Sequence, residues 1–228
     1  MDYRRLGLAG VKVSPICLGT AFRGQDDEAI CIRTIERAID LGCNFIDTAN
    51  FYGRGRSESI VGKALKGKRE DIVLASKVCS PMGDGPNDRG LSRFAIVREV
   101  ERSLTRLETD HLDLYILHQF DPHVRQEETM RTLDDLVRQG KVRYVGISNF
   151  SASQLTQTLW VCDNGSLESP VSLQSCYNLL ARIDIESEVM PLCRRHGVGI
   201  TTFSPLAIGL LTGRFRRGQP FPADTPWG

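Results

Sequence analysis

The sequence predicts an α/β protein, a (β/α)8 TIM-type barrel, and three observations support this fold class. Short apolar segments alternate regularly with longer amphipathic segments along the chain. The apolar segments are rich in Val, Ile, Leu and Phe and alternate little with polar residues, as expected of parallel strands buried on both faces. Polar residues lie at or near the carboxyl ends of five of these segments, and a barrel brings such ends together at one mouth.

The β-elements follow from local patterns. The opening segment Tyr3–Val13, which contains L-G-L-A-G-V-K-V, predicts a small β-hairpin ahead of the barrel. Seven barrel strands are expected after it. They are Ser14–Gly19, Asn44–Thr48, Ile72–Lys77, Leu112–His118, Tyr144–Ser148, Val171–Tyr177 and Gly199–Ser204.

The segments between the strands predict six helices, each with apolar residues at helical spacing. Ser57 is expected to cap the second helix, and several helices are expected to close on a glycine, such as Gly140, Gly165 or Gly197. The predicted helices are Asp27–Leu41, Ser57–Leu65, Ser92–Leu107, Glu127–Gln139, Ser151–Cys162 and Glu186–His196.

The last part of the chain shows no eighth strand. After the Ser204-Pro205-Leu206 motif, a segment rich in Pro and Gly continues to Gly228 and predicts a loop. A typical barrel of this kind has about 250 residues. We therefore expect one domain over residues 1–228 that is incomplete at its C-terminus and lacks the last helix–strand unit. No G-x-G-x-x-G or G-x-x-x-x-G-K-[ST] motif supports a Rossmann or P-loop fold.

Composition limits the class of protein and its partners. The net charge of +1 gives no electrostatic case for nucleic acid or an anionic membrane as the main partner. The seven cysteines are scattered, form no C-x-x-C pair and have no histidines at metal-ligand spacing, which favours reduced thiols in the cytoplasm and no metal site. No signal peptide or membrane-spanning apolar segment is visible.

Four polar residues are expected at the barrel mouth, and together they suit acid–base chemistry on a carbonyl. Each alone has an ordinary explanation: Asp47 as a cap, Tyr52 as packing, Lys77 as a solvated charge and His118 as a core histidine. A free tyrosine has a pKa of about 10 and needs help to donate a proton near neutrality. A neighbouring lysine held by an aspartate provides that help, and a histidine can orient the carbonyl oxygen. Since none of these groups supplies hydride, a cofactor is implied.

Six motifs occur in order along the chain: G-C-N-F-I-D-T-A-N-F-Y-G-R-G-R-S-E, A-S-K-V, D-L-Y-I-L-H, V-G-I-S-N-F, Q-S-C-Y-N-L and F-S-P-L. Together they resemble the aldo-keto reductase superfamily over nearly the whole chain, from Tyr3 to Phe215. The segments P-M-G-D-G-P-N-D-R-G and D-D-L-V-R-Q-G-K-V-R-Y-V-G resemble the branch that includes bacterial reductases and potassium-channel β-subunits. The resemblance implies a catalytic tetrad of Asp47, Tyr52, Lys77 and His118.

The resemblance also implies NADPH as the cofactor, with NADH as the alternative. The residues it assigns to the cofactor are Thr20, Asp47, Ser148, Asn149, Gln174, Phe203, Ser204, Leu206 and Arg214. A substrate pocket is expected from Phe22, Phe51, His118 and Phe120, although single aromatic residues are equally compatible with packing. Ile208 departs from the small or polar residue of many relatives, and the segments that grip the adenosine 2′-phosphate and the substrate have no counterpart in this sequence.

Three functions follow, in this order. The first is an NAD(P)H-dependent oxidoreductase that reduces an aldehyde or ketone to an alcohol, with Tyr52 as general acid and a small carbonyl compound as substrate. The second is a cofactor-sensing or regulatory barrel with little activity, or an inactive truncated form; Trp160 and Trp227 would report cofactor binding. The third is a lyase that uses Lys77 as a Schiff base. A homo-oligomer is compatible with all three.

Overall fold

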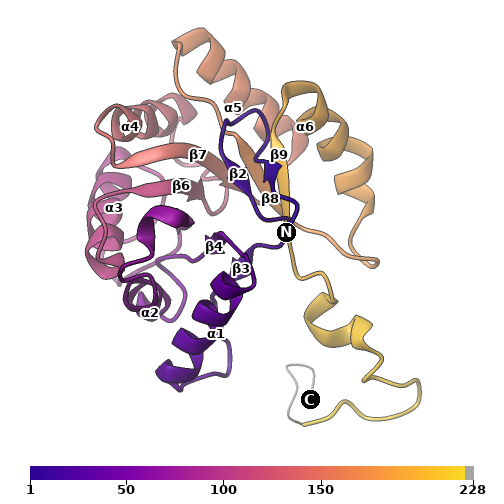
Figure 1. Ribbon diagram of the computed structural model, residues 1–228. Coiled ribbons are helices and arrows are strands. Elements are labelled where there is room, and N and C mark those ends of the chain that lie inside the picture. Colours follow the sequence, from indigo (N-terminus) through magenta and orange to yellow (C-terminus); the bar gives the residue numbers. More distant parts are fainter. Residues whose placement is uncertain (224–228) are drawn as a thin grey trace.

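The computed structural model of the protein describes residues 1–223, so the end of the predicted C-terminal loop, including Trp227, lies outside the described residues (Figure 1). Seven parallel strands form one curved sheet in the order of the sequence. They are β3 (Leu18–Gly19), β4 (Phe45–Asp47), β5 (Val73–Val78), β6 (Leu112–Leu117), β7 (Val142–Ser148), β8 (Ser172–Cys176) and β9 (Gly199–Phe203). The sheet with its outer helices confirms the predicted α/β barrel class as a seven-stranded arc of a (β/α) barrel.

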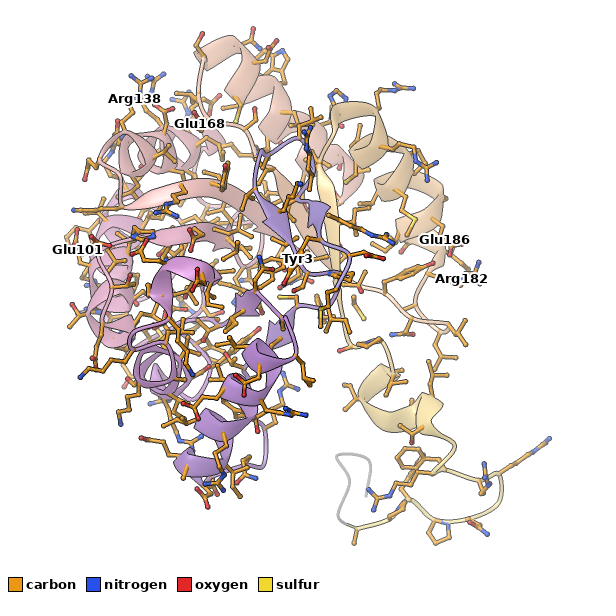
Figure 2. The ribbon with its side chains drawn as sticks, in the orientation of Figure 1. Tyr3, Glu101, Arg138, Glu168, Arg182 and Glu186 are labelled. Atoms are coloured by element: carbon orange, nitrogen blue, oxygen red, sulfur yellow. The ribbon has the colours of Figure 1, made fainter. Side chains whose placement is uncertain are left out.

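The helices lie on the outer side of the sheet (Figure 1). They are α1 (Glu28–Asp40), α2 (Arg56–Ala64), α3 (Arg93–Leu107), α4 (Gln126–Arg138), α5 (Ala152–Gly165) and α6 (Met190–His196). Charged side chains lie on their outward faces, as Figure 2 shows for Glu101 of α3 and Arg138 of α4. Shorter elements are the 3-10 helices η1 (Arg69–Asp71) and η3 (Ala207–Thr212) and the π-helix η2 (Ile185–Val189).

Side-chain caps account for three of the six α-helix starts, and one predicted cap needs a correction. Asp27, Ser92 and Ser151 cap α1, α3 and α5 through their side chains, as their residue types favour. The prediction that Ser57 caps α2 is wrong. Gly55 occupies the cap position with a left-handed backbone (φ 94°), and Ser57 lies inside the helix with a buried side chain. The hydroxyl of Ser57 is instead used in buried hydrogen bonds to Thr20 and Thr48.

Two apolar cores lie on the two faces of the sheet, because successive residues of a strand point to opposite faces. On β5, Val73 and Ala75 belong to the inner core of the barrel, whereas Leu74 and Val78 belong to the large core between sheet and helices. Lys77 continues the inward row of Val73 and Ala75. The strand alternation therefore places the lysine inside the barrel.

The predicted N-terminal hairpin is confirmed as β1 (Arg4–Arg5) and β2 (Lys12–Val13), which pair antiparallel. Its Leu6 and Val13 are buried in the inner core, so the hairpin covers the amino-terminal end of the barrel. Gly7 between them has φ 59°, and a Cβ on it would meet the carbonyl oxygen of Val171 at 2.4 Å. A side chain at Gly7 would thus push the hairpin off the barrel end.

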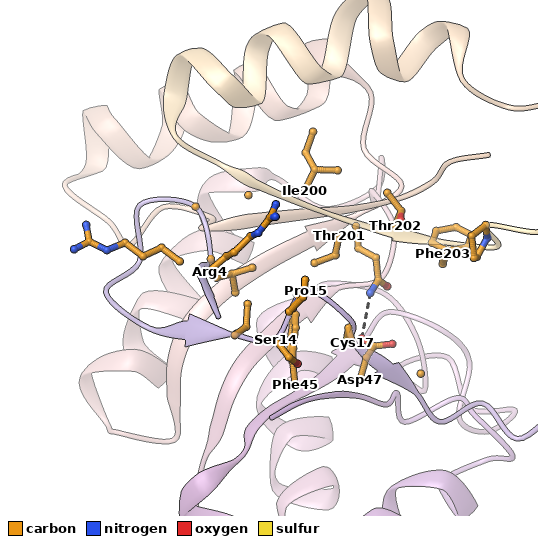
Figure 3. A pocket seen from close by; sticks show the side chains of 18 of the residues that line it. Arg4, Ser14, Pro15, Cys17, Phe45, Asp47, Ile200, Thr201, Thr202 and Phe203 are labelled. Carbon is orange, nitrogen blue, oxygen red and sulfur yellow. Dashed lines mark hydrogen bonds between the residues drawn. The ribbon is translucent and has the colours of Figure 1, made fainter. Parts of the chain in front are cut away.

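The curved sheet remains open on one side within residues 1–223. There β3 pairs only with β4, and β9 pairs only with β8. A cavity of about 520 Å³ lies between these two edges. Figure 3 shows Cys17 and Asp47 on one wall of it and Thr201 and Phe203 on the other. The segment that follows β9 runs away from the barrel (Figure 1). No helix in residues 1–223 is long and apolar enough to cross a membrane.

Candidate active site

Lys77 is the centre of the candidate site. Its side chain is fully buried near the end of β5, and its Nζ donates to Asp47 Oδ2 at 2.6 Å, to the Thr48 carbonyl at 2.8 Å and to the Tyr52 hydroxyl at 3.0 Å. Burial alone would lower the pKa of this ammonium group. The Asp47 carboxylate and Tyr52 outweigh that effect, so the pKa of Lys77 is raised above its ordinary value. The ammonium form is therefore the stable one.

The surroundings of Lys77 also bear on the lyase hypothesis. A Schiff base needs a neutral amine that can reach a substrate carbonyl. Here Nζ has three acceptors for its three N–H groups, and the side chain has 0% exposure. This geometry weighs against Lys77 as a covalent nucleophile and favours a role next to Tyr52.

Tyr52 reaches Lys77 from the loop between β4 and α2. The chain turns back through three consecutive left-handed residues, Gly53, Arg54 and Gly55, with φ of 58°, 52° and 94°. At the base of the loop, the hydroxyls of Thr48 and Ser57 lie 2.8 Å apart. The loop is thus closed at its base and presents the Tyr52 hydroxyl to the barrel interior.

His118 follows β6 and lies beside Tyr52. The two rings meet edge-on, with centroids 6.0 Å apart, and Ser80 Oγ lies 3.4 Å from His118 Nδ1. Burial, reinforced by the charge of Lys77, lowers the pKa of His118 from 6.5 to about 4. The imidazole is therefore neutral at physiological pH, and a neutral ring has one N–H that can donate to a substrate oxygen.

The lowered pKa of His118 predicts a pH dependence of stability. Between pH 6.5 and about 4 the unfolded chain binds a proton at this histidine and the folded chain does not. The free energy of unfolding should therefore be retained above this window and fall as the pH drops through it. Urea unfolding across the window measures the effect, with His118→Gln as the comparison because glutamine does not titrate. An equal loss of stability in both proteins would contradict the assignment.

A cavity of about 840 Å³ opens above these residues at the carboxyl ends of the strands. Most of the side chains predicted from the sequence line it. They are Phe51, Tyr52, Asp47, His118, Ser148, Asn149, Gln174, Phe203, Ser204 and Leu206. The volume lies within the range of about 300–1,000 Å³ that small-molecule sites usually have.

Three polar residues at the ends of β7 and β8 are linked to one another and to Asp47. Ser148 pairs with Gln174 across the sheet, and Asn149 Nδ2 donates to Ser148 Oγ at 3.1 Å and to the His118 carbonyl at 3.0 Å. Gln174 Nε2 donates to Asp47 Oδ1 at 3.2 Å, the bond drawn in Figure 3. The predicted cofactor side and the predicted catalytic side are therefore one continuous hydrogen-bonded wall.

Besides the fully buried Lys77, four predicted residues do not line this cavity, and their assigned roles stay predictions. Thr20 is fully buried, with its hydroxyl bonded to the Asp47 carbonyl at 3.0 Å. Phe22 packs against the large core. Phe120 meets Phe150 edge-on, with centroids 5.5 Å apart. Arg214 is exposed in the segment after η3.

Sequence reasoning missed several residues of the cavity wall. Ser80 and Gln119 each lie two residues beyond the end of a strand, β5 and β6, so the same strand-end argument could have found them. Arg23 gave no such signal, because it lies in an irregular segment between β3 and α1. The remaining residues of the cavity wall that were not predicted are Gly19, Ala21, Gly53, Pro205, Ile208 and Gly209.

Known proteins resemble this chain over almost its whole length. A probable voltage-gated potassium channel subunit beta from Arabidopsis thaliana is 39% identical over 230 residues, covering 99% of this chain and 70% of that protein. The uncharacterized oxidoreductase YrpG from Bacillus subtilis is 43% identical over 226 residues, covering 94% and 69%. The aldo-keto reductase YhdN from the same organism is 38% identical over 231 residues, covering 98% and 68%.

The family profile agrees with these relatives. The profile described as the aldo/keto reductase family matches residues 15–227, a range that includes all seven barrel strands and every residue around Lys77 described above. The resemblance predicted from the six sequence motifs is confirmed. The chain belongs to the aldo/keto reductase family.

Proposed function

We propose that the protein is an NAD(P)H-dependent oxidoreductase that reduces an aldehyde or ketone to an alcohol. The observation that carries the proposal is the position of Lys77 Nζ, 2.6 Å from the Asp47 carboxylate and 3.0 Å from the Tyr52 hydroxyl beneath a cavity. An ammonium group hydrogen-bonded to the phenol oxygen can stabilise the negative charge left there when the proton is donated. That arrangement suits a general acid that must protonate a carbonyl oxygen as it gains negative charge.

Each residue has one task in this proposal. Tyr52 donates its proton to the carbonyl oxygen, and Lys77 stabilises the phenolate that remains. Asp47 keeps Lys77 charged and in place, and neutral His118 donates a hydrogen bond that orients the substrate oxygen. A bound nicotinamide cofactor would supply the hydride.

The wall of the cavity fits the nicotinamide part of such a cofactor. Ser148, Asn149 and Gln174 offer hydroxyl and amide groups suited to a carboxamide, and Phe203 offers an aromatic face beside them. Ser204 continues the wall with a left-handed backbone (φ 55°). We propose NADPH as the cofactor because the family resemblance implies it, and NADH is the alternative cofactor to be tested.

A direct assay tests the proposal. The purified chain should oxidise NADPH, followed by loss of absorbance of the reduced nicotinamide, when supplied with a panel of aliphatic and aromatic aldehydes and ketones. The alcohol product should appear in equal amount. Cofactor binding without turnover for every carbonyl compound would contradict the reductase function and support a binding module.

We expect Asn149→Ala to weaken cofactor binding about tenfold, since it removes the amide that links Ser148 to the His118 carbonyl and faces the cavity. Ser153→Ala on the exposed start of α5 is the matched control and should bind normally. Fluorescence of the cofactor itself should be measured. Trp160 is a poor reporter because it lies with Leu8 and Gly197 at the amino-terminal ends of the strands. Equal affinity of both variants would contradict this assignment.

A second candidate function is a cofactor-binding regulatory barrel. It is favoured by the similarity to proteins named as potassium channel β subunits in Arabidopsis thaliana and Oryza sativa. This hypothesis expects tight NADPH binding with negligible turnover in the same assay. If the protein is a reductase, it should both bind NADPH tightly and turn it over.

A further inference from the structure

The loop that carries Tyr52 is attached to helix α3 by one buried hydrogen bond. Asn50, two residues before Tyr52, donates from Nδ2 to Glu99 Oε2 at 3.1 Å. The exposures of Asn50 and Glu99 are 0% and 2%, so water does not compete for this bond. It joins two residues that are 49 positions apart in the sequence.

Glu99 is a firmly held acceptor. Arg102 Nη1 donates to its Oε1 at 2.8 Å, and Arg106 Nη2 lies 3.9 Å from its Oε2. Arg106 in turn donates to the buried Glu58 of α2 at 2.6 Å. Because these groups are paired, the oxygens of Glu99 are held in place.

Asn50 is an unexpected residue type for this position if stability alone is considered. Its Oδ1 is buried and has no hydrogen-bond partner among the described residues. A buried oxygen without a partner is destabilising, and an apolar side chain of similar size would avoid that cost. The bond to Glu99 is the only side-chain hydrogen bond that Asn50 makes in the described structure. The contribution of Asn50 is therefore to fix the position of the loop.

The rest of the loop does not provide the same restraint. Thr48 and Ser57 close its base, but Gly53, Arg54 and Gly55 beyond Tyr52 adopt left-handed conformations that glycine populates easily. Among residues 1–223, Asn50 is the residue that attaches the Tyr52 side of the loop to a neighbouring helix through a buried side chain. Its backbone N–H reaches the Lys77 carbonyl of β5 at 3.5 Å, a longer contact.

We propose that Asn50 and Glu99 are positioning residues that keep the Tyr52 hydroxyl within hydrogen-bonding distance of Lys77. Asn50 fixes the loop against α3. Helix α3 in turn packs against α2 and against β5, the strand that carries Lys77. The effect on catalysis rests on the proposed reductase function. The effect on the position of Tyr52 does not.

The test compares three variants by carbon-13 NMR of the tyrosine Cζ atoms, which respond to the surroundings of the hydroxyl. The chain has five tyrosines, so the Tyr52 signal can be assigned from a Tyr52→Phe sample. Asn50→Ala should shift or broaden this signal. Glu99→Gln, which keeps an oxygen that can accept from Asn50, should change it less. Arg102→Gln removes one partner of Glu99 but leaves the Asn50 bond to Oε2, and should change the signal less than Asn50→Ala does.

Kinetics provide the second readout. Asn50→Ala should lower kcat by about 10- to 100-fold with little change in KM, because substrate binds normally but the acid is misplaced. Thr158→Val, which removes a buried hydrogen bond from α5, controls for simple loss of stability. An unchanged Tyr52 signal in Asn50→Ala would overturn the proposal. A wild-type chain without turnover would overturn the reductase function instead, and the NMR result would still decide the role of Asn50.

Discussion

Tyr52→Phe is expected to lower kcat by about 10²- to 10⁴-fold, the usual contribution of a general acid. The substitution removes one oxygen, which accepts from Lys77 Nζ at 3.0 Å. The ring can keep its edge-on contact with His118, so the fold and the cavity should remain. The loss should therefore fall on turnover, with cofactor affinity close to that of the wild type.

Steady-state oxidation of NADPH measures kcat, and cofactor titration and thermal unfolding show whether the variant is intact. Tyr3→Phe is the matched control because its phenol donates to the Gly42 carbonyl at 3.0 Å, away from the cavity. It should keep full activity. Turnover of Tyr52→Phe at the wild-type rate would exclude Tyr52 as the acid.

Lys77→Met is expected to give the largest loss of stability, about 3–5 kcal/mol, because it leaves a buried carboxylate without its partner. Asp47 is 6% exposed, and its remaining side-chain contact is the Gln174 amide at 3.2 Å. The ammonium group also satisfies the Thr48 carbonyl and the Tyr52 hydroxyl, so three acceptors lose a donor at once.

Urea unfolding at neutral pH measures this loss, and a second variant identifies its cause. When Asp47→Asn is combined with Lys77→Met, no charge is left unpaired, and part of the lost stability should return. If the double variant is as unstable as the sum of the two single variants, the unpaired charge is not the reason.

The strand-end argument succeeded because it needs only the period of two along a strand. Val73, Ala75 and Lys77 point into the barrel, and so do Leu114 and Ile116, which His118 follows. Since all the strands of a parallel barrel run in one direction, residues at their carboxyl ends lie close together independently of the loop conformations. The sequence order of the strands and the residues around Lys77 could therefore be predicted without any structure.

Loops and helix ends were less predictable because side-chain direction there depends on tertiary contacts. Ser57 has the residue type of a cap, yet it is buried inside α2 and bonds to Thr20 and Thr48. Phe22 and Phe120 follow strands, as Phe51 does, but only Phe51 lines the cavity. No local pattern could reveal the bond between Asn50 and Glu99, because its two ends belong to different units of the barrel.

Asp47 and Gln174 stand between two cavities. They line both the cavity at the mouth and the cavity between β3 and β9, so the partition between the two is one layer of side chains thick. The bond from Gln174 Nε2 to Asp47 Oδ1 at 3.2 Å lies in this partition. A ligand that fills the mouth would therefore touch the side chain that pairs with Lys77, and its binding would be coupled to the lysine through Asp47.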